Sequence, residues 1–256
     1  MARILVTGST QGIGSETARQ LIAMGHSVVT HARDASRVDA TNEAVPGALE
    51  IVVGDLASIG DTIALAEQAN ALGPFDAIIH NAGLGPGSEV REQTGDGLER
   101  IFHTNVVGPF IVTALMPIAP RMVYLTSGRE EEGRWTPEDL QWTAREWRGM
   151  QAYSDSKLHD SMLAVELAAR HPESIVNAVN PGWIKTRMGG AGAPDPLHLG
   201  AETQVWLATS DDPGALESGR YVKRREEQVP NPAVRDAAAR AALIAELERI
   251  AGIALP

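Results

Sequence analysis

Short apolar runs alternate with longer stretches of helical periodicity along most of the chain. Most of the runs are rich in Val or Ile, which is typical of strands that are buried on both faces of a sheet. The predicted strands are Ile4–Thr7, Val28–Thr30, Leu49–Val53, Ala77–His80, Met122–Thr126 and Ile175–Asn180. The predicted helices between them are Ile13–Met24, Ile59–Ala71, Leu98–Leu115 and Ala152–Arg170. This order predicts βαβ units, which build a parallel sheet through right-handed crossovers.

The last third of the chain is less regular. The stretch Gly189–Pro196 is rich in Gly, Ala and Pro and predicts a mobile loop. A Pro-rich break at Pro230–Pro232 precedes the amphipathic pattern of Ala233–Ile250, which predicts a C-terminal helix. We find no internal repeat and no linker that would divide the sequence, so residues 1–256 are expected to form a single domain.

Composition narrows the function classes. An apolar share of 43% and a charged share of 21% predict a folded core rather than disorder. A net charge of −11 argues against a general surface for nucleic acid or anionic membranes. The absence of Cys excludes disulfides, thiolate nucleophiles and cysteine metal sites. The N-terminus enters a strand at once, and no apolar stretch is long enough to cross a bilayer, so a soluble cytoplasmic protein is expected.

A glycine-rich segment, Thr7–Gly14, directly follows the first strand and opens the first helix. Its spacing is Gly-x-x-x-Gly-x-Gly, and glycines here allow a tight turn and a close approach to a pyrophosphate. The free N–H groups at the start of the helix would then face the phosphates. A dinucleotide is the expected ligand, and a glycine-rich turn without a ligand is the alternative.

The segment Tyr153–Lys157 places a phenol and an ammonium four residues apart, about one turn on a helix. A nearby cation favours phenolate over phenol, so such a pair can exchange a proton well below the free tyrosine pKa of about 10. The spacing alone is common, and its meaning depends on what else the chain supplies.

A series of motifs, in the same order, resembles those of the short-chain dehydrogenase/reductase family over nearly the whole chain. They are Thr7-Gly8…Gly12-Ile13-Gly14, Asp55-Leu56, His80-Asn81-Ala82-Gly83, Asn105, Ser127, Tyr153…Lys157 and Pro181-Gly182…Thr186. The resemblance implies an α/β fold of Rossmann type, a doubly wound, mostly parallel sheet with helices on both faces. It also implies hydride transfer between a nicotinamide cofactor and a carbonyl or secondary alcohol.

The resemblance also assigns roles to the matching residues. Tyr153 would be the general acid for reduction and the base for oxidation, while Lys157 would lower its pKa and hold the nicotinamide ribose. Ser127 would orient the substrate oxygen, Asn105 would hold a water that links Lys157 to solvent, and no metal is required. His80 replaces the usual Asn and is expected to pack at a strand end. The expected cofactor-binding residues are Thr7, Gly8, Ser9, Gln11, Gly12, Ile13, Gly14, Arg33, Asp55, Leu56, Asn81, Ala82, Gly83, Tyr153, Lys157, Pro181, Gly182, Ile184 and Thr186.

The end of the second strand bears on the choice of cofactor. In NAD-preferring members of the family an acidic residue near this point holds the ribose hydroxyls. Here Ala32 takes that position and Arg33 follows it. A guanidinium suits a 2′-phosphate, so NADP(H) is expected to be preferred over NAD(H). The alternative is a solvated Arg33 paired with Asp34.

The spacing between Ser127 and Tyr153, 26 positions (153 − 127), is wider than in compact members of the family. A similar layout occurs in retinol-dehydrogenase-like and protochlorophyllide-reductase-like members, which also continue with Ser-Lys-Leu, as Ser156–Leu158 does here. The acidic run Glu130–Glu132 in the added segment, 128–150, is expected to be a solvated turn. The tryptophans of this segment would wall an apolar pocket or form a satellite core, and the core is favoured; they are Trp135, Trp142 and Trp147.

The loop after Thr186, residues 187–200, is expected to close over a small carbonyl or alcohol substrate. Apolar contacts there would come from Leu84, Met188 and Trp183, although Trp183 would equally suit local packing. Relatives commonly associate through the helices that hold Asn105 and Tyr153, so a homodimer or homotetramer is expected, without nucleic-acid or membrane partners. Two alternative functions stay open, a dinucleotide-binding sensor without turnover and an epimerase or dehydratase.

Overall fold

The computed structural model describes residues 1–87 and 89–256. Within these residues a sheet of eight strands has the order β3-β2-β1-β4-β5-β6-β7-β8, and only the β7–β8 pair is antiparallel. The strands are β1 (Arg3–Val6), β2 (Ser27–Ala32), β3 (Glu50–Val53), β4 (Ala77–His80), β5 (Arg121–Leu125), β6 (Ile175–Val179), β7 (Tyr221–Lys223) and β8 (Glu226–Glu227). The Rossmann-type, doubly wound sheet is confirmed, and β1 to β6 follow the predicted apolar runs. The short strands β7 and β8 were not predicted, because so few residues carry no readable alternation.

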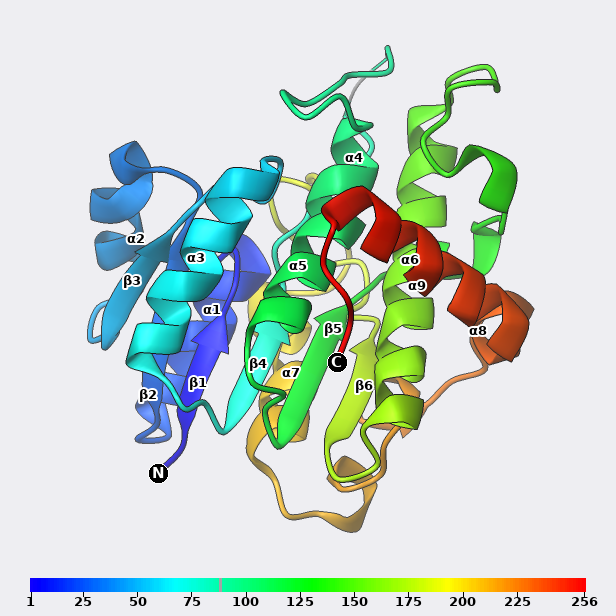
Figure 1. Cartoon of the computed structure of the whole chain (residues 1–256). Helices are drawn as coiled ribbons and strands as arrows, with labels where there is room; N and C mark the ends of the chain where they lie inside the picture. Colours follow the sequence, from blue (N-terminus) through cyan, green and yellow to red (C-terminus); the bar gives the residue numbers. More distant parts are fainter. Residues whose placement is uncertain (88) are drawn as a thin grey trace.

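Helices cover both faces of the sheet, with α3, α5 and α6 in front of it and α1 and α7 behind it in Figure 1. The long helices are α1 (Gly12–Ala23), α3 (Ile59–Leu72), α5 (Gly108–Leu115), α6 (Gly149–Arg170), α7 (Leu197–Thr209) and α9 (Ala237–Ala251). The short ones are α2 (Val38–Ala44), α4 (Arg100–Phe102) and α8 (Pro232–Arg235). Single 3-10 turns are η1 (Ala35–Arg37), η3 (Gly128–Glu132), η4 (Pro137–Asp139) and η5 (Pro213–Ala215).

The predicted helix Leu98–Leu115 is interrupted. A wider π-helical turn, η2 (His103–Val107), separates α4 from α5, and all five of its residues are buried. Apolar spacing continues through the turn, so the sequence pattern does not reveal it. Helix α7 begins at Leu197, which makes the end of the expected substrate loop helical.

The predicted C-terminal helix is also two helices. The Asp236 carboxylate accepts hydrogen bonds from the N–H groups of Ala238 and Ala239, so a new helix begins at this residue. The second of the two, α9, lies across the front of α6 (Figure 1).

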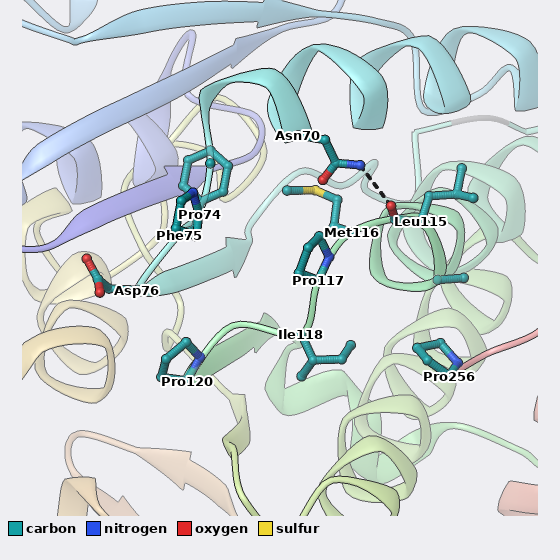
Figure 2. A pocket seen from close by; sticks show the side chains of 12 residues that line it. Asn70, Pro74, Phe75, Asp76, Leu115, Met116, Pro117, Ile118, Pro120 and Pro256 are labelled. Carbon is teal, nitrogen blue, oxygen red and sulfur yellow. Dashed lines mark hydrogen bonds between the residues drawn. The ribbon is translucent and has the colours of Figure 1, made fainter.

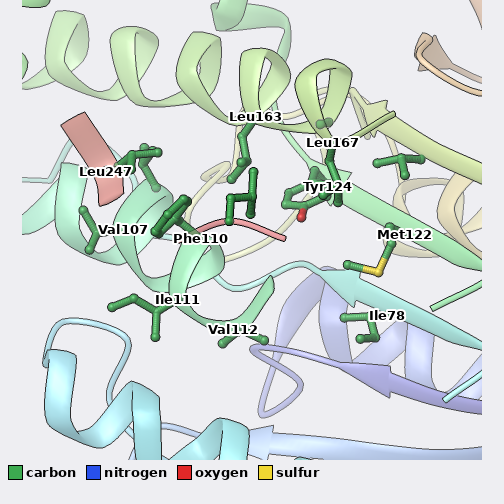
Figure 3. Close-up of a cluster of buried hydrophobic side chains, with 14 of the residues drawn as sticks. Ile78, Val107, Phe110, Ile111, Val112, Met122, Tyr124, Leu163, Leu167 and Leu247 are labelled. Atoms are coloured by element: carbon green, nitrogen blue, oxygen red, sulfur yellow. The ribbon is translucent and has the colours of Figure 1, made fainter. Parts of the chain in front are cut away.

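Two apolar cores lie on opposite faces of the sheet. In the front core, Tyr124 of β5 is surrounded by Phe110 of α5 and by Leu163 and Leu167 of α6, and Leu247 of α9 closes the same cluster (Figure 3). Burying one such side chain stabilises the fold by about 1.5–3 kcal/mol. This core fixes α6 and the end of β5 relative to each other, and both elements carry residues of the predicted catalytic set.

Helix α9 bears on the expected homodimer or homotetramer, because it covers the faces through which relatives commonly associate. Leu243, Ile244 and Leu247 are fully buried against α6 and the turn η2, which hold Tyr153 and Asn105. The front faces of these elements are therefore covered by the chain's own C-terminal helix. An association through these faces, as expected from the family, would require α9 to leave them.

Candidate active site

Two hollows stand out in the described part of the chain. The larger, about 880 Å³, lies at the amino ends of β4 and β5, where Pro74, Phe75, Pro117 and Pro256 line it (Figure 2). The second, about 610 Å³, lies at the carboxyl ends of the parallel strands and contains the predicted motif residues. Ligands of doubly wound sheets bind outside the carboxyl ends of the strands, so the second hollow is the candidate active site. We call it the cofactor cleft.

Most of the predicted cofactor-binding residues line this cleft. They are Gly8, Gln11, Gly12, Ile13, Gly14, Arg33, Asp55, Leu56, Asn81, Ala82, Gly83, Tyr153, Lys157, Pro181 and Thr186. Four others lie outside its lining, and they are Thr7, Ser9, Gly182 and Ile184.

The two hydroxyl residues outside the lining, Thr7 and Ser9, hydrogen-bond to the main chain around the glycine turn. The Thr7 hydroxyl oxygen accepts hydrogen bonds from the N–H groups of Asn81 (3.0 Å) and Ala82 (3.1 Å). The Ser9 hydroxyl donates to the carbonyl of Val6. Both side chains are buried, so their contribution is to fix the main chain that faces the cleft.

The shape of the glycine turn requires its glycines. Gly8 and Gly12 have φ of +67° and +63°, a region that residues with a Cβ rarely adopt. A Cβ on Gly14 would lie 2.3 Å from the carbonyl oxygen of Gly8 and 2.3 Å from Nδ2 of Asn81. Helix α1 then begins behind Gln11, whose side chain makes no capping hydrogen bond. The first N–H groups of α1 are thus free for an anion, and this geometry fits the pyrophosphate of a dinucleotide.

His31, which the sequence analysis did not single out, holds the turn from the side. Its Nδ1 accepts a hydrogen bond from the N–H of Gly8 (2.9 Å), and its Nε2 lies 2.8 Å from the carbonyl oxygen of Gly54. These partners assign the proton to Nε2, because an N–H can only donate and a carbonyl can only accept. Burial lowers the pKa of His31, which keeps the ring neutral and Nδ1 free to accept. No motif marks this residue, since only the fold brings the three segments together.

Two arginines line the cleft beyond the end of β2. Arg33 lines it but is exposed, and its Nε is 3.2 Å from the carboxylate of Asp34. Arg37 lines the same part of the cleft from η1. The sequence analysis missed Arg37, because the turn between the two arginines, capped by Asp34, is not visible as a pattern.

Tyr153 and Lys157 line the cleft from α6, one turn apart. The Tyr153 hydroxyl makes no hydrogen bond with any residue that the structure describes. Lys157 is buried, and its Nζ donates to the carbonyl oxygen of Leu125 (3.0 Å) and to Oδ2 of Asp160 (2.7 Å). Burial opposes the charge on Lys157, but Asp160 and Tyr153 outweigh this effect and raise its pKa. Lys157 is therefore an ammonium at neutral pH.

Asn105 lies outside the lining and connects the cleft wall to α6. Its Oδ1 accepts a hydrogen bond from the N–H of Leu84 (2.7 Å), and its Nδ2 donates to the carbonyl of Leu84 (3.0 Å) and to Oγ of Ser156 (2.9 Å). Oδ1 of Asn105 and Nζ of Lys157 both lie close to Gly83, at 3.3 and 3.4 Å from the position of a Cβ there. The side chain of Asn105 is thus fully used in fixing the loop after β4.

Ser127 follows β5 and is not among the residues that line the cleft. Its Oγ accepts a hydrogen bond from the N–H of Arg129 (3.2 Å), which leaves its own proton to donate. The hydroxyl of its neighbour Thr126 is buried and donates to the main-chain carbonyl of Lys157 (3.1 Å). Of the two hydroxyl groups, that of Ser127 is the one still available to a ligand.

The segment 128–150 contains the satellite core that the sequence analysis favoured. Trp142 is buried with Ile101 and Ala152, and Trp147 packs edge-on against it. Trp135 joins the front core instead. The arrangement is held by the Asp139 carboxylate, which accepts hydrogen bonds from the N–H groups of residues 143–145 and from Nε of Arg145. The guanidinium of Arg145 lies 3.9 Å over the ring of Trp142.

The acidic run of this segment is not wholly solvated, which corrects the expectation for Glu130. Its side chain is fully buried, and Oε1 accepts a hydrogen bond from the N–H of Asn231 (2.9 Å). Burial raises the pKa of Glu130 to about 7. Asn231 in turn donates from Nδ2 to the carbonyl of Gly133 (2.9 Å). Sequence alone could not find this contact, because its partners are 101 residues apart.

His80 packs at the end of β4, as expected. Its ring stacks on Tyr124 with 4.5 Å between the ring centroids, and burial lowers its pKa to about 3. In the loop after Ile184, Met188 lines the cleft and approaches Gly85. Trp183 is 58% exposed, and its Nε1 donates to the carbonyl of Gly189 (2.9 Å), so it contacts its own loop.

Comparisons with known proteins agree with this geometry. The family model described as short chain dehydrogenase matches residues 2–196. The chain is 38% identical over 261 residues to "Short-chain dehydrogenase chyC" of Penicillium rubens, covering 100% of both chains. It is 27% identical over 288 residues to human "Retinol dehydrogenase 13", covering 99% of this chain and 85% of that protein. A blue fluorescent protein from a metagenomic library, crystallised with NADPH, has a TM-score of 0.71 at 25% identity, covering 87% of this chain and 95% of that one.

No helix in residues 1–87 and 89–256 has the length and apolar character needed to cross a membrane.

Proposed function

The chain belongs to the short-chain dehydrogenase family, and from this premise we propose that it is an NADP-dependent oxidoreductase that uses Tyr153 as its general acid and base. Oxidoreductase chemistry with a nicotinamide dinucleotide follows from the family. The preference for NADP, the role of Tyr153 and the substrate class are our proposals. The substrate would be a small carbonyl compound or the corresponding secondary alcohol.

The observation that carries this proposal is the free Tyr153 hydroxyl beside a buried ammonium at the cleft. In reduction, Tyr153 gives its proton to the carbonyl oxygen, and the Lys157 ammonium stabilises the phenolate that remains. In oxidation, the phenolate takes the proton from the alcohol. A nicotinamide cofactor held in this cleft would supply or accept the hydride. The glycine turn, which the neutral His31 holds in shape, would bind the pyrophosphate and so orient the cofactor relative to Tyr153.

Two further residues take supporting roles in this proposal. Ser127 donates its remaining hydroxyl proton to the substrate oxygen, and this requires the substrate to reach beyond the lining of the cleft. Asn105 acts by position, since both of its amide atoms already bind Leu84 and Ser156. A water that links Lys157 to solvent would then use the main chain of the π-helical turn η2.

The preference for NADP is supported by Arg33 and Arg37, which both line the cleft beyond the end of β2, where the adenosine would lie in this proposal. Two guanidinium groups suit a 2′-phosphate. The ribose diol of NAD is better bound by a carboxylate. The pairing of Arg33 with Asp34 is exposed and weak, so a phosphate can replace it. A lower KM for NAD than for NADP in wild-type kinetics would contradict this part of the proposal.

The test of the whole proposal is the consumption of NADPH with a panel of ketones, aldehydes, quinones and retinoids. Tyr153→Phe removes only the hydroxyl, so kcat should fall by about 1,000-fold, while the Kd for NADPH, measured by fluorescence titration, stays close to that of the wild type. Unchanged turnover in Tyr153→Phe would sink the mechanism. A wild type that binds NADPH but consumes none would favour a sensor, and conversion without net NADPH consumption would favour an epimerase or dehydratase.

We also propose a cytoplasmic location and a homo-oligomeric state. The first can be tested by cell fractionation and the second by sedimentation analysis. Because α9 covers the front of α6 and η2, the oligomer would use other surfaces than those two elements.

A further inference from the structure

Two buried carboxylates lie on α6 and face different neighbours. Asp155 accepts hydrogen bonds from the N–H of Arg134 (2.9 Å) and from Nε2 of Gln151 (2.8 Å), so it fastens the segment 128–150 to the helix. Asp160 contacts Nζ of Lys157 at 2.7 Å through Oδ2. Its other oxygen, Oδ1, has no hydrogen-bond partner among the residues that the structure describes.

The surroundings of Asp160 indicate that this carboxylate does not stabilise the fold. The side chains of Asp160 and Lys157 are only 4% and 6% exposed, so both charges have been removed from water. A buried carboxylate with one unpaired oxygen is costly unless its charge is compensated. The compensation here comes from Lys157, a residue that the proposed mechanism uses.

We infer that Asp160 is a positioning residue, which holds the Lys157 ammonium against β5 and keeps it charged, and so maintains the action of Lys157 on Tyr153. This inference rests on the proposed function for its chemical meaning. An ammonium has three N–H groups. One binds the carbonyl of Leu125 and one binds Asp160, which leaves a single N–H for the cleft. The direction of that last N–H is therefore fixed before any ligand enters.

The effect of Asp160 follows from the signs of the charges. Burial opposes the charge on Lys157, and the carboxylate of Asp160 works against this effect, so Asp160 helps to keep Lys157 an ammonium. The ammonium in turn favours the phenolate form of Tyr153, which the proposed mechanism needs. Removing the carboxylate charge should therefore weaken the action of Lys157 on Tyr153.

Other titratable groups near the pair do not compete for this role. Tyr124 of β5 faces Asp160, and burial raises the pKa of Tyr124, so it stays a neutral phenol. His80 of β4 stacks behind Tyr124 with its pKa lowered to about 3 by burial. On η2, burial also lowers the pKa of His103. Arg240 of α9 is paired with Glu166, further along α6.

Asp160 itself is close to titration in the physiological range. Burial raises its pKa to about 6, against the opposing effect of Lys157. Below that pH Asp160 is neutral and no longer opposes the effect of burial on the charge of Lys157. The influence of Asp160 should therefore be present at neutral pH and fade in acid.

The test is the titration of Lys157 itself, which needs neither substrate nor turnover. The chain has three lysines, and Lys157→Met assigns the resonance of Lys157 in protein labelled with carbon-13 lysine. In Asp160→Asn, which keeps an oxygen for Lys157, the midpoint of this resonance should fall by about one pH unit. The pH profile of kcat should move in the same direction.

The controls separate charge from shape. Asp160→Glu should restore a midpoint near that of the wild type, and Glu166→Gln, which removes a carboxylate elsewhere on α6, should leave it unchanged. An unchanged midpoint in folded Asp160→Asn would overturn the inference, even if turnover fell. If Asp160→Asn does not fold, Lys157→Met serves instead, and the carboxyl resonance of Asp160 must then titrate at higher pH than in the wild type. Failure of turnover in the wild type would contradict the proposed function alone.

Discussion

Two regions of the molecule, the cofactor cleft and the segment 128–150 beyond Ser127, are built by different means. At the cofactor end, the main chain of one short turn makes the surface, and its shape is set by glycines and by the neutral ring of His31. In the segment 128–150, which we propose lies toward the substrate and call the substrate end, side chains from distant segments hold one another, as Glu130 and Asn231 do across 101 residues. The first end is a local structure with a motif, whereas the second is a network of polar contacts that has none.

This difference suggests that the two ends can be damaged separately. A change in the glycine turn should remove cofactor binding directly, because in our proposal the main chain itself is the binding surface. A change in the polar network should leave the cofactor end intact and disturb the part of the site that receives the substrate.

Gly14→Ala should have the largest effect. The new Cβ would lie 2.3 Å from the Gly8 carbonyl oxygen, and a backbone atom cannot move aside without displacing the turn. Overpacking of this kind costs about 1–3 kcal/mol, so the Kd for NADPH should rise by about 100-fold. Fluorescence titration would measure it.

The matched control is Gly60→Ala in α3, where a Cβ meets nothing within 4 Å. This change should leave NADPH binding as it is and slightly raise the melting temperature, since alanine favours a helix. Equal losses of affinity in both variants would mean that the turn is not the binding surface.

Asp139→Ala should damage the other end. It removes a buried carboxylate that binds three main-chain N–H groups and the guanidinium of Arg145. Leaving these donors unpaired should cost on the order of 2–3 kcal/mol of the free energy of unfolding. We expect a lower kcat/KM for the carbonyl substrate with little change in the Kd for NADPH.

The exposed neighbour Glu138 provides the comparison for this change. Glu138→Ala should affect neither stability nor kinetics, because it alters the charge without touching the network. If Asp139→Ala weakened NADPH binding as strongly as substrate turnover, the two ends could not be regarded as independent.

The same division explains what could be predicted from the sequence. Strands β1 to β6, the glycine turn and the placement of Tyr153 and Lys157 follow from local patterns, and the structure contains them. The roles of His31, Arg37 and Asp160 depend on segments that meet only after folding. Glu130 was misjudged for the same reason, since three successive glutamates indicate a solvated turn unless a distant partner covers one of them.

The turn η2 and the helix α9 illustrate two other limits. The π-helical turn keeps an apolar spacing that fits an ordinary helix, so Leu98–Leu115 was predicted as continuous. The amphipathic pattern of the C-terminal helix was recognised, but an apolar face does not say what it covers. Only the fold assigns that face to α6 rather than to another subunit.

Glu130→Gln should have the smallest effect, and it should depend on pH. The pKa of Glu130 in the folded chain is about 7, above its ordinary value of 4.5. A raised pKa means that the folded state holds the proton more tightly, so this contribution to stability is complete below pH 4.5 and is lost as the pH rises through 7. Glutamine cannot ionise and keeps the oxygen that accepts from Asn231, but its buried amide offsets part of the gain.

At about pH 8 the Gln variant should therefore be more stable than the wild type by about 1 kcal/mol, and this advantage should be lost in mild acid. Urea unfolding over a series of pH values would measure it. Glu132→Gln, on the exposed part of the same turn, should show no such dependence. The contrary result would be that the wild type and Glu130→Gln keep the same difference in stability from mild acid to alkali. It would show that water reaches this carboxylate. The contact between Glu130 and Asn231 would then be a surface contact, and the substrate end would lose one of the buried links that distinguish it from the cofactor end.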